Sequence, residues 1–205
     1  MEKYRQEDFP ITIVRPSHTY SNRSVPTAIH GDKGSWQVLK RMLDGKPVII
    51  HGDGTSLWTL THSSDFAKGI HGLMGNIHAI GQAVHITSDE SVTWNQVYEI
   101  IARELNVPLK AVYVSSRLLS DSPRYDLEGG LLGDKANTVV FDNTKLPRLV
   151  PQYNAGIRAD QGLRRTIQYI LEHTECQTEA IEFDQWCDSF AEIMAEASDQ
   201  MKKLI

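Results

Sequence analysis

Short apolar runs, each bounded by polar or turn-forming residues, recur along the first two thirds of the chain. Runs of this length that are rich in β-branched residues predict brief strands rather than helices. The runs at 11–14 and 83–87 are typical of parallel strands that are buried on both faces. The predicted strands lie at residues 11–14, 47–50, 57–61, 83–87, 111–114 and 139–141.

Between these runs, apolar positions recur with the period of an amphipathic helix, and most such segments begin near a residue able to cap it. Thr93 and Gln96 form the clearest signal, a capping box. Residues 1–8 resemble the last turns of a helix already under way. The other predicted helices begin at Ser35, at Ser63 or Ser64, and behind Asp142 or Asn143, and two more cover about 156–173 and 179–203.

Polar stretches with glycine or proline separate the elements. Residues 16–34 and 120–137 predict long loops, and loops of that length are often functional. Residues 51–54 predict the tight turn of a hairpin that leads into the strand at 57–61. Alternating strands and helices of this kind predict an α/β fold. The last helix carries an apolar stripe that requires a partner surface, formed by Trp186, Phe190, Ile193, Met194, Ala197 and Met201.

Composition narrows the class of protein. The chain has 205 residues, of which 40% are hydrophobic and 23% charged, as in a soluble globular domain. Its net charge of −5 argues against binding the phosphate backbone of nucleic acids. No apolar run is long enough to span a bilayer, and the charged start does not resemble a signal peptide, so we expect a cytoplasmic protein. Cys176 and Cys187 predict neither a disulfide framework nor a thiolate zinc site.

Four segments, in this order, resemble the C-terminal portion of an extended short-chain dehydrogenase/reductase, the NAD-dependent epimerase/dehydratase family. They are Ile13 to Tyr20, Gly52-Asp53-Gly54-Thr55 continuing to Ala67, Val84 to Trp94, and Phe141-Asp142-Asn143-Thr144-Lys145. The resemblance covers about residues 1–170. It implies an incomplete Rossmann-like, doubly wound α/β domain, with its last strands interleaved with a smaller substrate-binding lobe over 1–175. Residues 176–205 are then a helical extension.

Two motifs of that family do not occur in these 205 residues. There is no glycine-rich turn with the spacing that brings backbone amides to a pyrophosphate. None of the seven tyrosines has a lysine four residues later, so the catalytic Tyr-x-x-x-Lys pair is expected upstream of Met1. The isolated chain is therefore expected to be inactive and to bind NAD or NADP weakly. Apolar sheet surface would be hidden by dimerisation, by element swapping or by docking of an N-terminal piece.

The resemblance implies hydride transfer between a nicotinamide and a sugar-like or nucleotide-sugar substrate, with this chain forming the substrate-side walls. A non-catalytic module of the same fold, which binds a metabolite or a protein partner, is the alternative, and a purely structural role for the last helix is a third.

The resemblance also implies candidate site residues. Pro16 and Ser17 would lie beside the nicotinamide, and His18 and Tyr20 beside the substrate. The alternative for His18 is a loop histidine that is hydrogen-bonded to nearby backbone. Trp58 stands where many nucleotide-sugar enzymes have a diphosphate-binding arginine. It would stack on a sugar or base, or belong to the core.

A second group of candidates is polar. One interpretation is that Arg23, Lys33 and the helix start at Ser35 together bind an anion such as a diphosphate. The alternative is that they belong to a solvated loop with scattered charges. Asp134 and Lys135 lie in the loop that closes over the substrate in family members, where a surface role is equally open. The histidines lack the spacing of a metal site, so no metal is expected.

Overall fold

A computed structural model describes residues 9–204, so the helix expected at residues 1–8 lies outside the described part. The strands are short. Five of the six predicted strand positions contain or overlap one or two observed strands, and the last, at 139–141, does not. The observed strands are β1 (Ile13–Pro16), β2 (His18–Tyr20), β3 (Val48–His51), β4 (Leu57–Trp58), β5 (Leu60–His62), β6 (Ala83–Ile86), β7 (Val92–Thr93) and β8 (Ala111–Val114).

The helices largely follow the predicted periodic segments. They are α2 (Trp36–Leu43), α3 (Ser63–Leu73), α4 (Trp94–Glu104), α5 (Ser116–Ser120), α6 (Glu128–Gly130), α7 (Lys145–Leu149), α8 (Ala159–Glu172) and α9 (Ile181–Lys202). Short 3₁₀ turns, η1 and η3, occupy Ile77–Ala79 and Thr174–Cys176, and η2 is a π-helical turn at Leu131–Lys135.

The strands pair two by two. β1 with β6, β2 with β5, and β3 with β8 are parallel, whereas β4 and β7 are antiparallel. The predicted strand at 11–14 therefore does lie parallel to the one at 83–87, with Ile13 opposite Ala83. β1 is not buried on both faces as expected, since Arg15 and Pro16 are exposed. The reason is that, among residues 9–204, β6 is the one strand that pairs with β1.

The chain between β3 and β5 departs from the predicted hairpin. The turn itself is present, because the Gly54 amide donates to the His51 carbonyl at 3.1 Å and Gly52 and Gly54 have φ of +60° and +70°. However, β3 pairs with β8, and the run at 57–61 divides into β4 and β5, which pair with β7 and β2. At the division, the Thr59 carbonyl accepts a hydrogen bond from the Ser17 hydroxyl at 2.8 Å.

Two further predictions about the chain after β8 are wrong. Residues 120–137 contain α6 and the π-helical turn η2 rather than loop alone. Residues 139–141 form no strand, since one backbone hydrogen bond, from the Val139 amide to the Leu57 carbonyl at 3.1 Å, joins them to β4. A single bond holds this segment beside β4 without forming a ladder.

Local capping chemistry explains several helix starts. The Thr93–Gln96 capping box of α4 is confirmed, with both reciprocal hydrogen bonds present. At α3 the cap is His62, whose ring Nδ1 accepts from the Ser64 amide, rather than either serine. Ser35 stands at the N-cap of α2, but its hydroxyl makes no cap bond.

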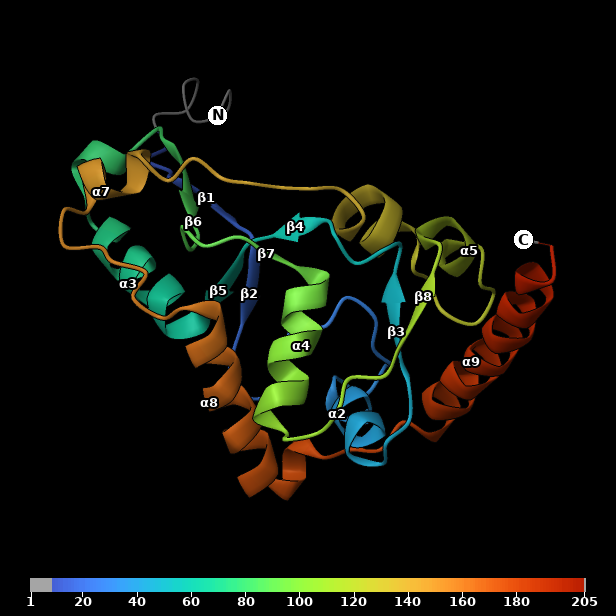
Figure 1. Cartoon of the computed structure of the whole chain (residues 1–205). Helices are drawn as coiled ribbons and strands as arrows, with labels where there is room; N and C mark the ends of the chain where they lie inside the picture. The colour runs from blue at the N-terminus through green and yellow to red at the C-terminus, as the bar shows by residue number, and fades with distance from the viewer. Residues whose placement is uncertain (1–8, 205) are drawn as a thin grey trace.

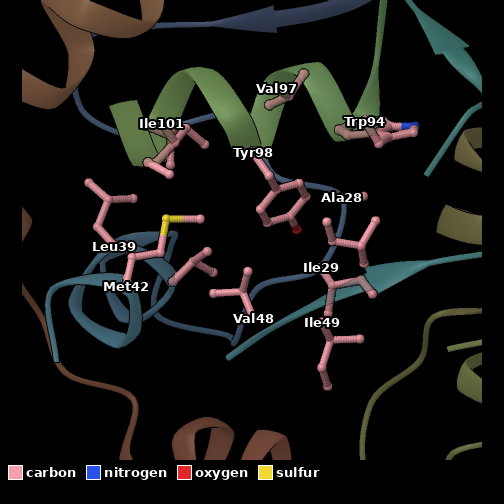
Figure 2. Close-up of a cluster of buried hydrophobic side chains, with 14 of the residues drawn as sticks. Ala28, Ile29, Leu39, Met42, Val48, Ile49, Trp94, Val97, Tyr98 and Ile101 are labelled. Carbon is pink, nitrogen blue, oxygen red and sulfur yellow. The ribbon is translucent and has the colours of Figure 1, made fainter. Parts of the chain in front are cut away.

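Side chains gather in two cores. Leu73, Val84, Ile86 and Leu146 belong to a small core between β6, α3 and α7. A larger core lies between α4, α2 and β3, where the Tyr98 ring of α4 points toward Ile29 (Figure 2). Figure 1 shows β6, α3 and α7 on one side of the molecule and α2 and β3 on the other, while α4 and α8, which lie between them in the view, contribute side chains to the larger core.

The first turns of α9 pack into the larger core. Phe183 and Cys187 are buried, and the Arg41 guanidinium, only 1% exposed, lies 2.7 Å from Asp184 and 2.8 Å from Asp188. The beginning of the segment 176–205 is thus integral to the larger core. Its division from 1–175 as a separate unit stays a prediction.

Candidate functional site

A cavity of about 410 Å³ opens where β1 ends and β2 begins. Its walls come from four separate parts of the chain: the β1–β2 junction, β4, the π-helical turn and the segment after it. The lining residues are Pro16, Ser17, His18, Thr19, Trp58, Asp134, Val139 and Phe141. Five of these were candidates from the sequence, and the fold brings them together at one place.

The turn from Pro16 to Thr19 is held rigidly at the cavity edge. Pro16 has a fixed φ and no amide hydrogen. The Thr19 amide donates to the Ser17 carbonyl at 2.9 Å, and the Ser17 hydroxyl donates to the Thr59 carbonyl at 2.8 Å. Because the Ser17 hydroxyl is used in this way, the turn offers a ligand mainly its shape and the apolar face of Pro16.

His18 is the ionisable ring that lines the cavity. It packs edge-on against Trp94, with ring centroids 6.3 Å apart. Burial and the nearby charge of Lys135 together lower the pKa of His18 to about 4, with Asp134 opposing the shift. The ring is therefore neutral at neutral pH. A neutral imidazole offers a ligand one donor and one acceptor.

The carbonyl oxygen of Lys135 anchors the π-helical turn to the body. It accepts hydrogen bonds from the Ser56 hydroxyl at 2.8 Å and the Trp94 indole at 3.1 Å, and His51 Nε2 lies 3.1 Å away. The Lys135 ammonium is 3.3 Å from the Asp134 carboxylate. These contacts keep Asp134 at the cavity wall and Lys135 directly beside it.

Trp58 combines the two roles that the sequence left open. Its side chain is 5% exposed and stacks on Trp94, with ring centroids 6.2 Å apart, so most of it belongs to the core. Part of the residue nevertheless lines the cavity. Its indole nitrogen is buried and hydrogen-bonds no group in the described part of the chain. The tryptophan supplies a flat apolar wall at the position where many of the resembled enzymes have a diphosphate-binding arginine.

Two further lining residues were not predicted from the sequence. Val139 and Phe141 line the cavity, and the Phe141 ring lies 5.0 Å from the His85 ring. Phe141 and Thr19 belong to segments that carried the family resemblance, which was an available signal, whereas Val139 was marked only as part of an expected strand. With Pro16, these side chains fit one end of a cofactor, a flat ring such as nicotinamide. No glycine-rich cradle for its pyrophosphate occurs in the sequence.

The remaining candidates lie elsewhere. Tyr20 is 6% exposed, packs edge-on against His62 and faces Gly162 of α8. Ser35 is buried and its hydroxyl is already paired with the Val25 amide at 2.8 Å and the Ser24 hydroxyl. Lys33 lines a different cavity near the start of α9, and Arg23 is an exposed loop residue. The roles given to these four residues stay predictions.

The described residues contain no group of three or more histidine, cysteine, aspartate or glutamate side chains placed to hold a metal ion. Both cysteines are free, and burial raises the pKa of the Cys187 thiol to about 12. In residues 9–204, no helix combines the length and the apolar character that crossing a membrane would require.

Sequence comparisons were made with protein families and with curated proteins. The sequence model of the NAD dependent epimerase/dehydratase family matches residues 1–87. A 2'-dehydrokanamycin reductase from Streptomyces kanamyceticus is 27% identical over 132 residues, which are 60% of this chain and 34% of that protein. An uncharacterised UDP-glucose epimerase, YtcB, from Bacillus subtilis is 33% identical over 99 residues, which are 48% of this chain and 30% of that protein.

Solved structures extend the likeness to most of the chain. A UDP-glucuronic acid 4-epimerase from Bacillus cereus, in complex with UDP-glucuronic acid and NAD, has a TM-score of 0.64 at 22% identity and is matched over 82% of this chain and 48% of that chain. A dTDP-glucose 4,6-dehydratase from Bacillus anthracis, in complex with NAD, has a TM-score of 0.63 at 18% identity, with coverages of 85% and 49%.

These matches confirm the resemblance and the fold class derived from the sequence, a partial Rossmann-like α/β domain. The chain spans about a third of the length of the two curated relatives and about half of the two solved structures.

Proposed function

We propose that this chain, which resembles NAD-dependent epimerases and dehydratases and matches their sequence model over residues 1–87, forms the substrate side of such an enzyme. The substrate is a sugar or nucleotide sugar, bound in the cavity at the end of β1. One observation carries the proposal: five residues that the resemblance assigned to cofactor or substrate line a single cavity of about 410 Å³.

The position of the cavity supports this assignment. Ligands of open α/β sheets bind beyond the carboxyl ends of the parallel strands. β1 and β6 run parallel, and the cavity begins at Pro16, the last residue of β1. The volume also lies within the range of about 300–1,000 Å³ that is usual for small-molecule sites.

Each wall has a chemical task in the proposed complex. The flat faces of Trp58 and Phe141 pack on the apolar face of a sugar or on a planar ring. The neutral His18 ring and the Asp134 carboxylate hydrogen-bond hydroxyl groups, and their fixed positions orient the sugar. When bound, a nicotinamide would supply the hydride acceptor or donor, and the turn at Pro16 and Ser17 would pack beside it and exclude water.

Ligand binding to the 205-residue chain tests the proposal directly. Amide resonances are followed by two-dimensional NMR during titration with UDP-glucose, with UDP and with glucose. We expect saturable shifts for the nucleotide sugar at residues 17–19 and 134–135. Absence of shifts at millimolar ligand, or shifts confined to another surface, would refute the assignment of the cavity.

A matched pair of variants sharpens the test. Asp134→Asn removes a carboxylate from the cavity wall, whereas Asp32→Asn removes one from an exposed position outside it. We expect the first variant to weaken binding about tenfold, the cost of one hydrogen bond to a charged group, and the second to leave it unchanged. Equal effects of the two variants would contradict the proposed pose.

NAD provides a separate measurement. Because the 205 residues contain no glycine-rich turn for the pyrophosphate, we expect no saturation by NAD in the micromolar range. Calorimetry that shows micromolar NAD binding by this chain would contradict this part of the proposal, while the sugar titration stands on its own.

A non-catalytic binding module is the second candidate. It is favoured by one sequence fact, the absence of a Tyr-x-x-x-Lys pair in these 205 residues. The same cavity would then hold a metabolite without transforming it. This function predicts saturable sugar binding and no hydride exchange in the intact protein as it occurs in the cell. The enzyme function predicts sugar binding and hydride exchange.

A further inference from the structure

The second half of α9 has an apolar face that the body does not cover. The side chains buried in α9, Phe183 and Cys187, belong to its first two turns. Further along, Ile193 is 62% exposed and Leu204, just beyond the helix, is 85% exposed. Figure 1 shows α9 at one edge of the molecule, with the C-terminus at its far end.

The exposed residues follow the repeat of a coiled coil. Ile193, the half-buried Ala197 and Gln200 are spaced four and three residues apart, which places them in one line along the helix, and Leu204 continues the spacing just beyond the end of the helix. We call this line the α9 seam. Three of its four members are apolar, and the spacing is that of the a and d positions through which two helices pack together.

The charges beside the seam select the direction of a partner helix. Acidic side chains occur along α9 up to Asp199, and Lys202 and Lys203 follow at its end. A second copy placed parallel would set like charges opposite each other, whereas an antiparallel copy sets the basic end against the acidic stretch. In this register, Ala197 of one copy lies opposite Gln200 of the second copy, and Ile193 lies opposite Leu204. Glu196 then lies beside Lys203 of the second copy. Because the pair is symmetric, this contact occurs twice.

We propose that residues 193–204 pair antiparallel with the same segment of a second copy of this chain, through the α9 seam and two Glu196–Lys203 contacts. The contact covers about three helical turns. This is less than the roughly 1,200–2,000 Å² of a standard stable interface, so the dimer is weak and depends on concentration. The pairing is independent of the proposed sugar site, which lies on other elements.

Sedimentation velocity across a wide range of chain concentrations tests the pairing. We expect reversible dimer formation by the wild type. Glu196→Lys and Lys203→Glu should each raise the dimer dissociation constant about tenfold, because each change turns two attractive contacts into two repulsive ones. Lys202→Glu is the matched control: it makes the same charge change on the face opposite the seam and should alter the constant less than twofold.

Mixing the two weakened variants tests whether their weaker dimerisation comes from the two charge contacts rather than from damage to α9. In a heterodimer of the Glu196→Lys and Lys203→Glu chains, both contacts become attractive again, so the mixture should dimerise about as well as the wild type. Circular dichroism of each variant verifies that α9 remains helical. The proposal is overturned by a wild type that stays monomeric at every concentration, by equal effects of the seam and control variants, or by a mixture that fails to dimerise.

Discussion

His18 offers the sharpest test of the site, because its environment shifts a titration that is easily measured. Burial lowers the pKa of His18 from 6.5 to about 4, with the Lys135 ammonium and His30 acting in the same direction and Asp134 against it. A base whose pKa is lowered by folding binds a proton more readily in the unfolded chain. Stability from this group is therefore complete above pH 6.5 and is lost as the pH falls toward 4.

The size of the loss follows from the shift. A change from 6.5 to about 4 corresponds to roughly 3 kcal/mol in full, and to about 2 kcal/mol at pH 5. Because the ring lines an open cavity, solvent reduces this value. We expect His18 to cost between about 1 and about 2 kcal/mol of the free energy of unfolding at pH 5, relative to pH 7.5.

The assay compares the wild type with His18→Gln, by urea unfolding at several pH values between 7.5 and 5. The variant should lose less stability than the wild type over this range, by the amount stated above. His71→Gln, on the exposed surface of α3, is the control and should follow the wild type. NMR of the imidazole ring, assigned through the variant, should show a titration midpoint near pH 4.

Two outcomes would refute the reasoning. A midpoint for His18 near 6.5 would mean that the ring is well solvated, and hence that the cavity wall is not as described. Parallel stability curves for the wild type and His18→Gln would mean that burial of the ring does not penalise its charge. If the prediction holds, His18 is neutral at physiological pH, and any hydrogen bond from it to a ligand persists unchanged between pH 6 and 8.

Two further predictions concern packing and charge. Gly162→Ala places a methyl group onto the Tyr20 hydroxyl and should cost about 1 kcal/mol in urea unfolding, because overpacking outweighs the better helix propensity of alanine. The cost should fall when the change is combined with Tyr20→Phe, which removes the nearest atom, and an undiminished cost would contradict the contact. Asp184→Asn should lower the free energy of unfolding by about 2 kcal/mol at neutral pH, since it removes a charged partner of the buried Arg41. Glu182→Gln, the control, loses only a surface ion pair and should cost less than about 0.5 kcal/mol. Equal losses for the two variants would refute the role of the Arg41 contact.

The sequence was sufficient wherever the cause of a structure is local. α4 begins at Thr93 because a capping box satisfies its free amides, and both partners lie within four residues. α2 ends before Gly45, whose φ of +68° suits glycine and terminates the helix. The short β-branched runs became strands at most of the predicted positions, because strand propensity also acts over a few residues.

The choice of strand partners was not accessible in this way. The hairpin expected after β3 is wrong because β8, more than sixty residues later in the chain, provides the neighbour instead. The segment at 139–141 had the composition of a strand but makes one backbone bond to β4. Pairing depends on which edges the whole fold leaves available, and no local pattern records that.

The same distinction applies to the residues that line the cavity. Pro16, His18, Trp58 and Asp134 were found through residue types at family-like positions, whereas Thr19, Val139 and Phe141 were assigned to the cavity only from the three-dimensional structure. Tyr20 was also a candidate, but it lies at the far end of β2, where its ring faces Gly162 of α8.

By itself, therefore, the sequence determined most of the helices, most of the strands and the fold class, since these follow from capping, periodicity and motif order. The tertiary structure decided which strands pair, which half of α9 is covered, and which side chains share one cavity. Those features arise from contacts between residues far apart in the chain, whose free energies depend on the packing of all their neighbours.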